Sequence, residues 1–194
     1  LNFLKKNRVA ISSLSNKFYL KTLGEFKIKK NLLKINKNDY SVNFNFLRKN
    51  INSKTKAIIF GDFFFNILNL DKIKKLCKNK KIMLIEDVSN NLGVKDHNIK
   101  SGTFGDITIC DFSLGKTITC GEGGALLTNN KRVFDKAKEI RDGKNLTYQT
   151  KNHENLCFRP TNLQAAMIFG QFKRLNDLVL NKKKIIERYK KNFL

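Results

Sequence analysis

KTKAIIF at residues 54–60 and KIMLI at residues 81–85 are short apolar runs that contain β-branched residues, as buried strands do. Between them, residues 70–78 carry apolar side chains at helical spacing. This order predicts a strand, a helix and a second strand. The two strands should run parallel, because a helical crossover returns the chain to the same end of the sheet before the next strand starts.

The same alternation continues towards the C-terminus. Two further apolar runs, DITIC at 106–110 and GALLT at 124–128, precede an amphipathic helix at 131–141. We therefore predict an α/β fold with a mostly parallel sheet, whose apolar strands are covered by helices on both faces. After Pro160, a helix is expected over 161–180 and a basic helix over 181–194. The expected buried side of the first consists of Ala165, Ala166, Ile168, Phe169, Phe172 and Leu175.

Length and composition are those of one globular domain. The chain has 194 residues, 41% of them hydrophobic, and neither a repeat nor a Ser/Gly linker marks a boundary. Its longest apolar stretch, residues 57–70, is interrupted by Asp62 and Asn66 and is too short to span a bilayer. The first residues contain no apolar run of signal-peptide length. We therefore predict a cytoplasmic protein with no membrane partner.

The chain carries a formal net charge of +23. Recognition of phosphates and base edges in nucleic acids favours Arg, but this chain has 32 Lys and only 7 Arg, with lysine pairs beside its apolar segments. That distribution is typical of a solvated surface and of an AT-rich coding sequence, so we predict no nucleic-acid partner. The positive field still favours an anionic substrate.

The cysteines and histidines form no recognisable metal or redox motif. The four cysteines contain no Cys-x-x-Cys pair, and two histidines are too few for a His-based metal cluster. We therefore predict reduced thiols and no metal site. These six residues are Cys77, Cys110, Cys120, Cys157, His97 and His153.

Three polar groups follow predicted strands, at the edge where open α/β sheets bind ligands. The first is the pair Glu86-Asp87, at the end of KIMLI. A carboxylate at the mouth of a buried strand is costly without a cationic partner, so the pair indicates a bound positive group. The alternative is that it caps the N-terminus of a helix that follows.

The second group is Lys116, within DFSLGKTITCGEGG at 111–124. The surrounding glycines can hold its amine away from water, where the neutral form acts as a nucleophile. The alternatives are a surface lysine and a tight glycine hairpin, and the string lacks the Gly-Lys-Ser/Thr of a Walker loop. The third group is FRPTNLQAA at 158–166, where Arg159 and Thr161 precede a helix. They either meet an anion there or, in the case of Thr161, cap the helix.

The order of IEDVSNNLG (85–93), KTITCGEGG (116–124) and RPTNLQAA (159–166) resembles the DegT/StrS family of sugar-nucleotide aminotransferases, which are pyridoxal 5'-phosphate (PLP) enzymes of fold type I. The resemblance covers residues 9–194. It implies that residues 1–194 are part of the PLP-binding large domain, and that residues 160–194 lead towards a C-terminal domain outside this sequence. The family's N-terminal Ser-Gly-Thr phosphate cradle is not recognisable here.

By this resemblance, Lys116 is the catalytic residue, which bonds covalently to PLP and moves a proton between cofactor and substrate. Asp87 pairs with the pyridine nitrogen, and Asn90 stands where the family has Gln or His beside the ring hydroxyl. Asp111 occupies the position of a family serine that holds the cofactor phosphate. Since a carboxylate repels a phosphate, Ser113 is the expected substitute.

The function implied by the resemblance is amination of a nucleotide-linked keto sugar, with an amino acid, expected to be glutamate, as donor. A homodimer is the expected working form, and the product would serve amino-sugar, polysaccharide or lipopolysaccharide biosynthesis. Cys157 stands where the family has an Asn that reaches the partner subunit's cofactor. The alternative is a truncated, non-catalytic relative that acts as a dimerising interaction protein. A related dehydrase is disfavoured, because those enzymes have His in place of Lys116.

Overall fold

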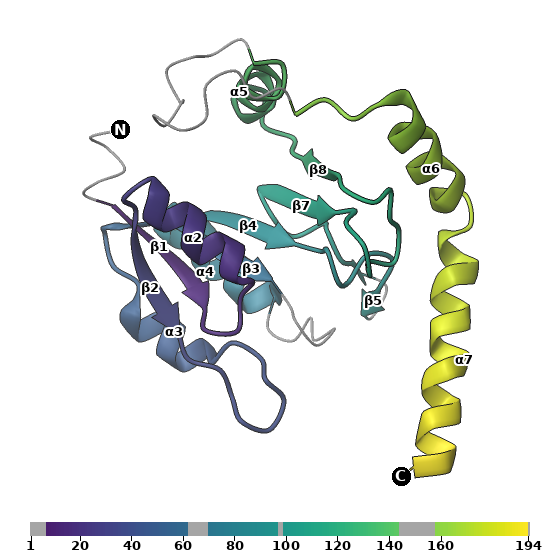
Figure 1. Cartoon of the computed structure of the whole chain (residues 1–194). Coiled ribbons are helices and arrows are strands. Elements are labelled where there is room, and N and C mark those ends of the chain that lie inside the picture. The colour runs from purple at the N-terminus through teal and green to yellow at the C-terminus, as the bar shows by residue number, and fades with distance from the viewer. Residues whose placement is uncertain (1–6, 62–69, 97–98, 144–157, 194) are drawn as a thin grey trace.

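The computed structural model describes residues 7–61, 70–96, 99–143 and 158–193, so Cys157, His97 and His153 lie outside the described residues. Its centre is a six-stranded sheet with the order β2-β1-β3-β4-β7-β8 (Figure 1). Only β8 runs antiparallel to its neighbour, which confirms the predicted, mostly parallel α/β fold. The strands are β1 (Arg8–Ser12), β2 (Lys29–Leu33), β3 (Thr55–Gly61), β4 (Met83–Asp87), β7 (Ile107–Asp111) and β8 (Gly124–Leu127), with a separate pair, β5 (Lys95–Asp96) and β6 (Ile99–Lys100).

Helices lie on both faces of the sheet, as the apolar strands predicted. Figure 1 shows α2 in front of the sheet and α4 behind it. In the part that the structure describes, every helix is too short or too polar to cross a membrane. The helices are α2 (Lys17–Glu25), α3 (Phe44–Asn50), α4 (Leu70–Lys80), α5 (Lys131–Arg141), α6 (Asn162–Phe172) and α7 (Leu175–Phe193).

The predicted strand–helix–strand unit is present as β3, α4 and β4. β3 and β4 pair in parallel from Ala57↔Met83 to Gly61↔Asp87, and β4 pairs with β7 up to Asp87↔Ile109. This register brings the carboxyl ends of three strands to one edge of the sheet. Polar residues that directly follow or end these strands therefore meet there, although they are far apart in the sequence.

Two apolar clusters hold the elements together. The larger lies between the sheet and helices α3 and α4, where Leu47, Leu70 and Ile73 are almost fully buried. The smaller lies beneath the segment that joins β7 to β8. It comprises Val88, Cys110, Phe112, Ile118 and Cys120, with Leu92, Ile168 and Leu175 packed against it.

The C-terminal helices differ from the prediction in two ways. The helix expected over 161–180 ends at Phe172, and residues from Leu175 onward form one continuous helix, α7. The expected buried side of α6 is wrong: Phe169 is 64% exposed and Phe172 44% exposed, while Ala165 and Ala166 are exposed as well. The apolar face of α6 is broader than its contact with the smaller cluster, so only Ile168 and Leu175 of the predicted set pack there.

Candidate active site

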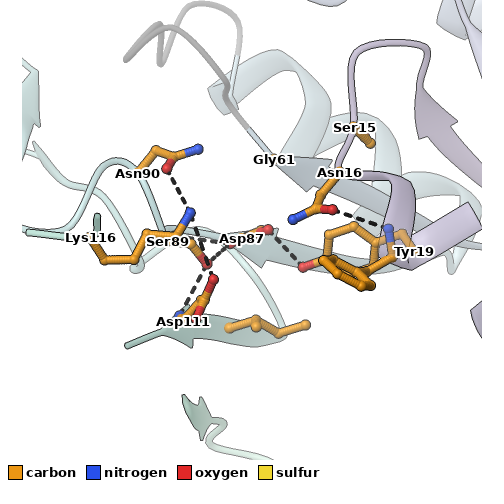
Figure 2. A pocket seen from close by; sticks show the side chains of 11 residues that line it. Ser15, Asn16, Tyr19, Gly61, Asp87, Ser89, Asn90, Asp111 and Lys116 are labelled. Atoms are coloured by element: carbon orange, nitrogen blue, oxygen red, sulfur yellow. Dashed lines mark hydrogen bonds and ion pairs between the residues drawn. The ribbon is translucent and has the colours of Figure 1, made fainter. Parts of the chain in front are cut away.

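A pocket of about 530 Å³ opens at the carboxyl edge of the sheet (Figure 2). Its floor comes from the ends of β3, β4 and β7, one wall from the start of α2, and another from the segment between β7 and β8. The described residues that line it are Ser15, Asn16, Phe18, Tyr19, Gly61, Asp87, Ser89, Asn90, Ile109, Asp111 and Lys116.

Lys116 reaches into this pocket from the segment 112–123. Its Nζ donates a hydrogen bond to Asn90 Oδ1 at 2.9 Å and lies 3.7 Å from Asp111 Oδ2. The side chain is only 18% exposed, so it is not a surface lysine. The glycines do not form a tight hairpin, because the connection between β7 and β8 is much longer than a two-residue turn. Gly115 and Gly121 instead have φ of +84° and +83°, which bend the connection around the lysine.

Helices α6 and α7 hold this lysine-bearing segment in place. Gln171 of α6 accepts from the backbone N–H of Thr119 at 3.1 Å and donates to its carbonyl at 2.6 Å. On the same helix, Gln164 donates to the carbonyl of Glu122 at 2.8 Å. Lys182 of α7 donates to the Thr117 hydroxyl at 2.9 Å. The residues on both sides of Ile118, which is fully buried, are therefore held by side chains from the C-terminal helices.

Asp87 faces the same pocket from the end of β4. Its Oδ1 accepts hydrogen bonds from the backbone N–H of Ser89, at 2.9 Å, and from the Ser89 hydroxyl. Its Oδ2 accepts from the Tyr19 hydroxyl at 2.7 Å. Residues 89–93 form turns, so the alternative that Asp87 caps a helix is wrong. The carboxylate is held instead at the pocket floor with both oxygens hydrogen-bonded.

Glu86 points the other way, because successive side chains of a strand alternate between the faces of a sheet. Its carboxylate accepts the backbone N–H groups of Gly102, Phe104 and Gly105, at 2.6, 3.0 and 3.0 Å. The residue is 2% exposed. Three backbone donors satisfy this buried carboxylate in place of the cationic group that the sequence suggested. Of the acidic pair, only Asp87 belongs to the pocket.

Of the other two predicted site residues, Asn90 lines the pocket and Ser113 does not. Asn90 is the hydrogen-bond acceptor for Lys116. Ser113 bonds to Asp111 through both its backbone N–H, at 2.8 Å, and its hydroxyl, at 2.9 Å. Asp111 thus has the pocket position, between Lys116 and Ser113. A role for Ser113 in holding a phosphate stays a prediction.

Sequence reasoning missed the wall formed by Ser15, Asn16 and Tyr19. The Ser15 Oγ is buried and has no hydrogen-bond partner among the described residues. Asn16 caps α2 by accepting the N–H of Phe18 at 3.1 Å. Burial, followed by the charge of Asp87, raises the pKa of Tyr19, so its hydroxyl remains a proton donor. The available signal was the polar run SSLSN at 12–16, which directly follows the apolar residues of β1.

The segment around Arg159 does not join the pocket. Thr161 caps α6, and Gln164 completes a capping box by accepting the backbone N–H of Thr161 at 2.9 Å. Arg159 Nε lies 2.9 Å from Asp142 Oδ1. Hydrogen bonds from Arg141 and Arg159 hold the pKa of Asp142 well below its usual range. The capping alternative for Thr161 is therefore confirmed, and Arg159 serves an ion pair between two helix ends.

Comparisons with known proteins agree with this geometry. A sequence model described as the DegT/DnrJ/EryC1/StrS aminotransferase family matches residues 7–194. GDP-perosamine synthase of Escherichia coli O157:H7 is 32% identical over 75% of this chain and 41% of its own length. UDP-4-amino-4,6-dideoxy-N-acetyl-beta-L-altrosamine transaminase of Helicobacter pylori is 30% identical over 81% of this chain and 43% of its own. The chain thus spans about two-fifths of the length of these relatives.

Among solved structures, GDP-4-keto-6-deoxy-D-mannose-3-dehydratase of E. coli, with bound hydrated PLP, has a similar fold. Its TM-score is 0.81, with 20% identity, and the match covers 97% of this chain and 54% of that one. At that identity the likeness concerns the fold alone.

Proposed function

Because this chain belongs to the DegT/DnrJ/EryC1/StrS aminotransferase family, we propose that it supplies the PLP-binding part of an enzyme that aminates a nucleotide-linked keto sugar. The observation that carries this proposal is the pairing of an amine and a carboxylate across one pocket. Lys116 enters it from the segment after β7, and Asp87 enters it from the end of β4. A largely buried amine and a hydrogen-bonded carboxylate in one pocket are the two groups that an aromatic aldehyde with a basic ring nitrogen requires.

The pocket residues suit PLP at its ring. Lys116 offers the amine for the aldehyde carbon, Asp87 offers the carboxylate for the ring N–H, and Asn90 offers an amide beside both. The unpartnered, buried hydroxyl of Ser15 lines the same pocket, which supports a polar ligand there. The carboxylate of Asp111 lines the pocket too and repels the anionic end of the cofactor, so the phosphate is expected to lie away from it.

When bound, PLP supplies an electron sink for the carbon from which a proton is removed. The chain's own residues supply orientation and proton transfer. Asn90 accepts a hydrogen bond from the Lys116 amine and thereby fixes its direction. Ser89 and Tyr19 donate hydrogen bonds to Asp87 and hold its carboxylate in place at the floor. Lys116 is then the group that takes the proton from one carbon and returns it to another.

The substrates follow from the relatives and remain part of the proposal. Both curated relatives described above are named for nucleotide-linked amino sugars, one with GDP and one with UDP. We propose a keto sugar on a nucleoside diphosphate as acceptor and an amino acid, glutamate, as donor. The net charge of +23 favours such an anionic acceptor. We also propose that the working form is a homodimer and that these residues are part of its large domain.

The decisive experiment locates the lysine that reacts with PLP. The protein is incubated with one equivalent of PLP and reduced with borohydride, and the labelled peptide is identified by mass spectrometry. Reduction makes the bond between PLP and the lysine permanent, so that the lysine that reacted can be identified among the 32 in the chain. We expect the label on Lys116, together with a visible absorbance band that is absent from Lys116→Ala.

Lys49→Arg, at an exposed position of α3, serves as the matched control and should keep both the label and the band. Label spread evenly over surface lysines in the wild-type protein would refute the proposed cofactor site. The donor is tested with unreduced protein that has been incubated with PLP. Release of 2-oxoglutarate from glutamate by the wild type, and not by Lys116→Ala, would support glutamate as the donor.

A further inference from the structure

The carboxylate of Asp111 lies at the end of β7 and is held by three groups of the protein. Ser113 donates its backbone N–H to Oδ1 at 2.8 Å and its hydroxyl to Oδ2 at 2.9 Å. The amine of Lys116 lies 3.7 Å from Oδ2. Figure 2 shows the lysine and this carboxylate next to each other in the pocket. A backbone N–H, a hydroxyl and an ammonium group are also the donors with which proteins bind a phosphate.

The described residues that line the pocket carry a charge that does not suit an anion. They include two carboxylates, those of Asp87 and Asp111, and one amine, that of Lys116. Two negative charges and one positive charge give this lining a formal charge of −1, although the whole chain has +23. The amine already faces Asp111. The described lining therefore offers a phosphate no cation that is not already paired.

We infer that Asp111 is a specificity-determining residue that removes most of the pocket's preference for a phosphorylated ligand over the same ring without phosphate. Its carboxylate occupies both donors of Ser113 and pairs with Lys116, and its own charge repels a phosphate. A cavity of about 530 Å³ is about 10 Å across, no more than the Debye length at 0.1 M salt, so this repulsion reaches a phosphate anywhere inside it. The inference rests on the proposed function and concerns the phosphate of the ligand, not its ring.

The proposed contact with the ring N–H does not depend on the Asp111 side chain. Asp87, which would make that contact, is held by Ser89 and Tyr19. Asp111 reaches this group through its backbone, because its N–H donates to the Ser89 hydroxyl at 3.1 Å. A substitution of the side chain keeps that hydrogen bond. It should therefore alter the binding of the phosphate and leave the binding of the ring almost unchanged.

The test compares pyridoxine with pyridoxine 5'-phosphate, two ligands that share the ring and carry an alcohol in place of the aldehyde, so that neither reacts with the lysines. Fluorescence titration gives the dissociation constants for wild type, Asp111→Ser and the nearly isosteric Asp111→Asn. In the wild type the two constants should differ by less than about threefold, because the charge of Asp111 offsets the attraction for the phosphate.

Both substitutions should raise the affinity for pyridoxine 5'-phosphate about tenfold, since a repulsion is removed and the donors of Ser113 are released. They should change the affinity for pyridoxine by less than about twofold, because it carries no phosphate.

Asp135→Asn is the matched control, because it removes the same charge at an exposed position of α5. β8 pairs with β7 from Asp111↔Gly124 to Thr108↔Leu127, so the chain enters α5 from the edge of the sheet opposite the pocket. This variant should bind both ligands as the wild type does.

A wild type that prefers the phosphate ester by about tenfold or more would overturn the inference without any variant. An unchanged ratio of the two dissociation constants in the Asp111 variants would also overturn it, as would an equal gain for both ligands or the same gain in Asp135→Asn. Pyridoxine binding tests the ring site separately, so if pyridoxine binds and the ratio does not change, only this inference fails. If neither ligand binds to the wild type or to either Asp111 variant, the proposed function fails, and the inference fails with it.

Discussion

Glu86 and Asp87 are adjacent acidic residues with different tasks. Strand alternation sends Glu86 to three backbone donors and Asp87 to the pocket. The first carboxylate closes the loop 102–105 onto β4, and the second is available to a ligand. Neutralising each one should therefore affect a different property of the protein.

We predict that Glu86→Gln lowers the free energy of unfolding by about 2 kcal/mol, because an amide cannot accept three buried N–H groups and turns its own NH₂ towards one of them. Asp87→Asn should lower it by less than half as much, because Asp87 has hydroxyl donors that can reorient. Urea denaturation measures both values. The reverse ranking, with Asp87→Asn the more destabilising, would contradict the assignment of roles.

The buried thiols make a second prediction at this scale. Burial, aided by Asp87 and Glu86, raises the pKa of Cys110 to about 11, and burial raises that of Cys77 to about 12. The thiolate is the reactive form. Near pH 8 the alkylation of Cys110 should thus be about a hundredfold slower than that of a free thiol, and its rate should rise as the pH approaches 11.

Iodoacetamide labelling followed by mass spectrometry checks this, in a Cys157→Ser background that removes the thiol outside the described residues. The same protein in urea provides the reference rate. Fast labelling of Cys110 in the folded protein at pH 8 would show that the strand end is open to solvent.

At the scale of elements, α6 stabilises the segment that carries Lys116. Gln171 supplies a donor and an acceptor to one peptide group, Thr119, as a neighbouring strand would. We predict that Gln171→Leu increases amide exchange in residues 117–121 by about tenfold, since each lost hydrogen bond contributes about 1 kcal/mol. Hydrogen exchange with mass spectrometry measures it. Asn176→Leu, at an exposed amide of α7, should leave exchange there unchanged.

The interior of α6 also contains a glycine that the helix does not need. A Cβ at Gly170 would meet no atom within 4 Å, and its φ is not in the left-handed region. We expect Gly170→Ala to raise the free energy of unfolding by about 0.5–1 kcal/mol, because alanine loses less backbone entropy in a helix. Thermal denaturation checks this. A loss of stability would indicate that another surface packs closely against this position.

Sequence patterns predicted the central elements well and the first part of the chain poorly. The strands at 55–61 and 83–87 contain the apolar runs AIIF and MLI, and α5 has the predicted bounds of Lys131–Arg141. β2 reads KKNLL and is mostly exposed at the edge of the sheet, and α2 has one buried residue, Leu23. Elements with so few apolar residues show no clear hydrophobic periodicity from which a strand or a helix could be predicted. The start of α2 and the two residues before it contribute Ser15, Asn16 and Tyr19 to the pocket, so that wall could not be predicted.

The site itself was predictable where glycines and charges follow strands. Lys116, Asp87 and Asn90 meet in one pocket. The sequence pattern placed Asp87 and Lys116 after predicted strands, and Asn90 was expected there only from the family resemblance. Directions of side chains were not predictable. Whether Glu86 or Asp87 faced the pocket depended on the pleat of β4. Which of Asp111 and Ser113 lined the pocket depended on the path of the connection after β7.

For the molecule as a whole, many of the exposed large apolar side chains described lie on the C-terminal helices. Leu163 is 72% exposed and Phe169 is 64% exposed, on a helix whose Ile168 already packs against the smaller apolar cluster. Soluble proteins rarely leave such faces uncovered. This surface supports the proposed homodimer.

We predict that the protein elutes as a dimer and that Phe169→Glu shifts it to a monomer, because a charge replaces an apolar contact at the covered face. Light scattering coupled to gel filtration gives the mass. Tyr40→Glu, at an exposed aromatic residue between β2 and α3, should not change it. A wild-type protein that is monomeric at micromolar concentration would contradict the prediction.

The division of the interior into two apolar clusters has a consequence for inactivation by heat. The lysine-bearing connection rests on the smaller cluster, which Ile168 and Leu175 complete from the C-terminal helices. Local opening costs least where few apolar contacts must be broken. On warming, turnover should therefore fade at a lower temperature than the helical circular-dichroism signal, and brief cooling should restore it while the sheet is still intact.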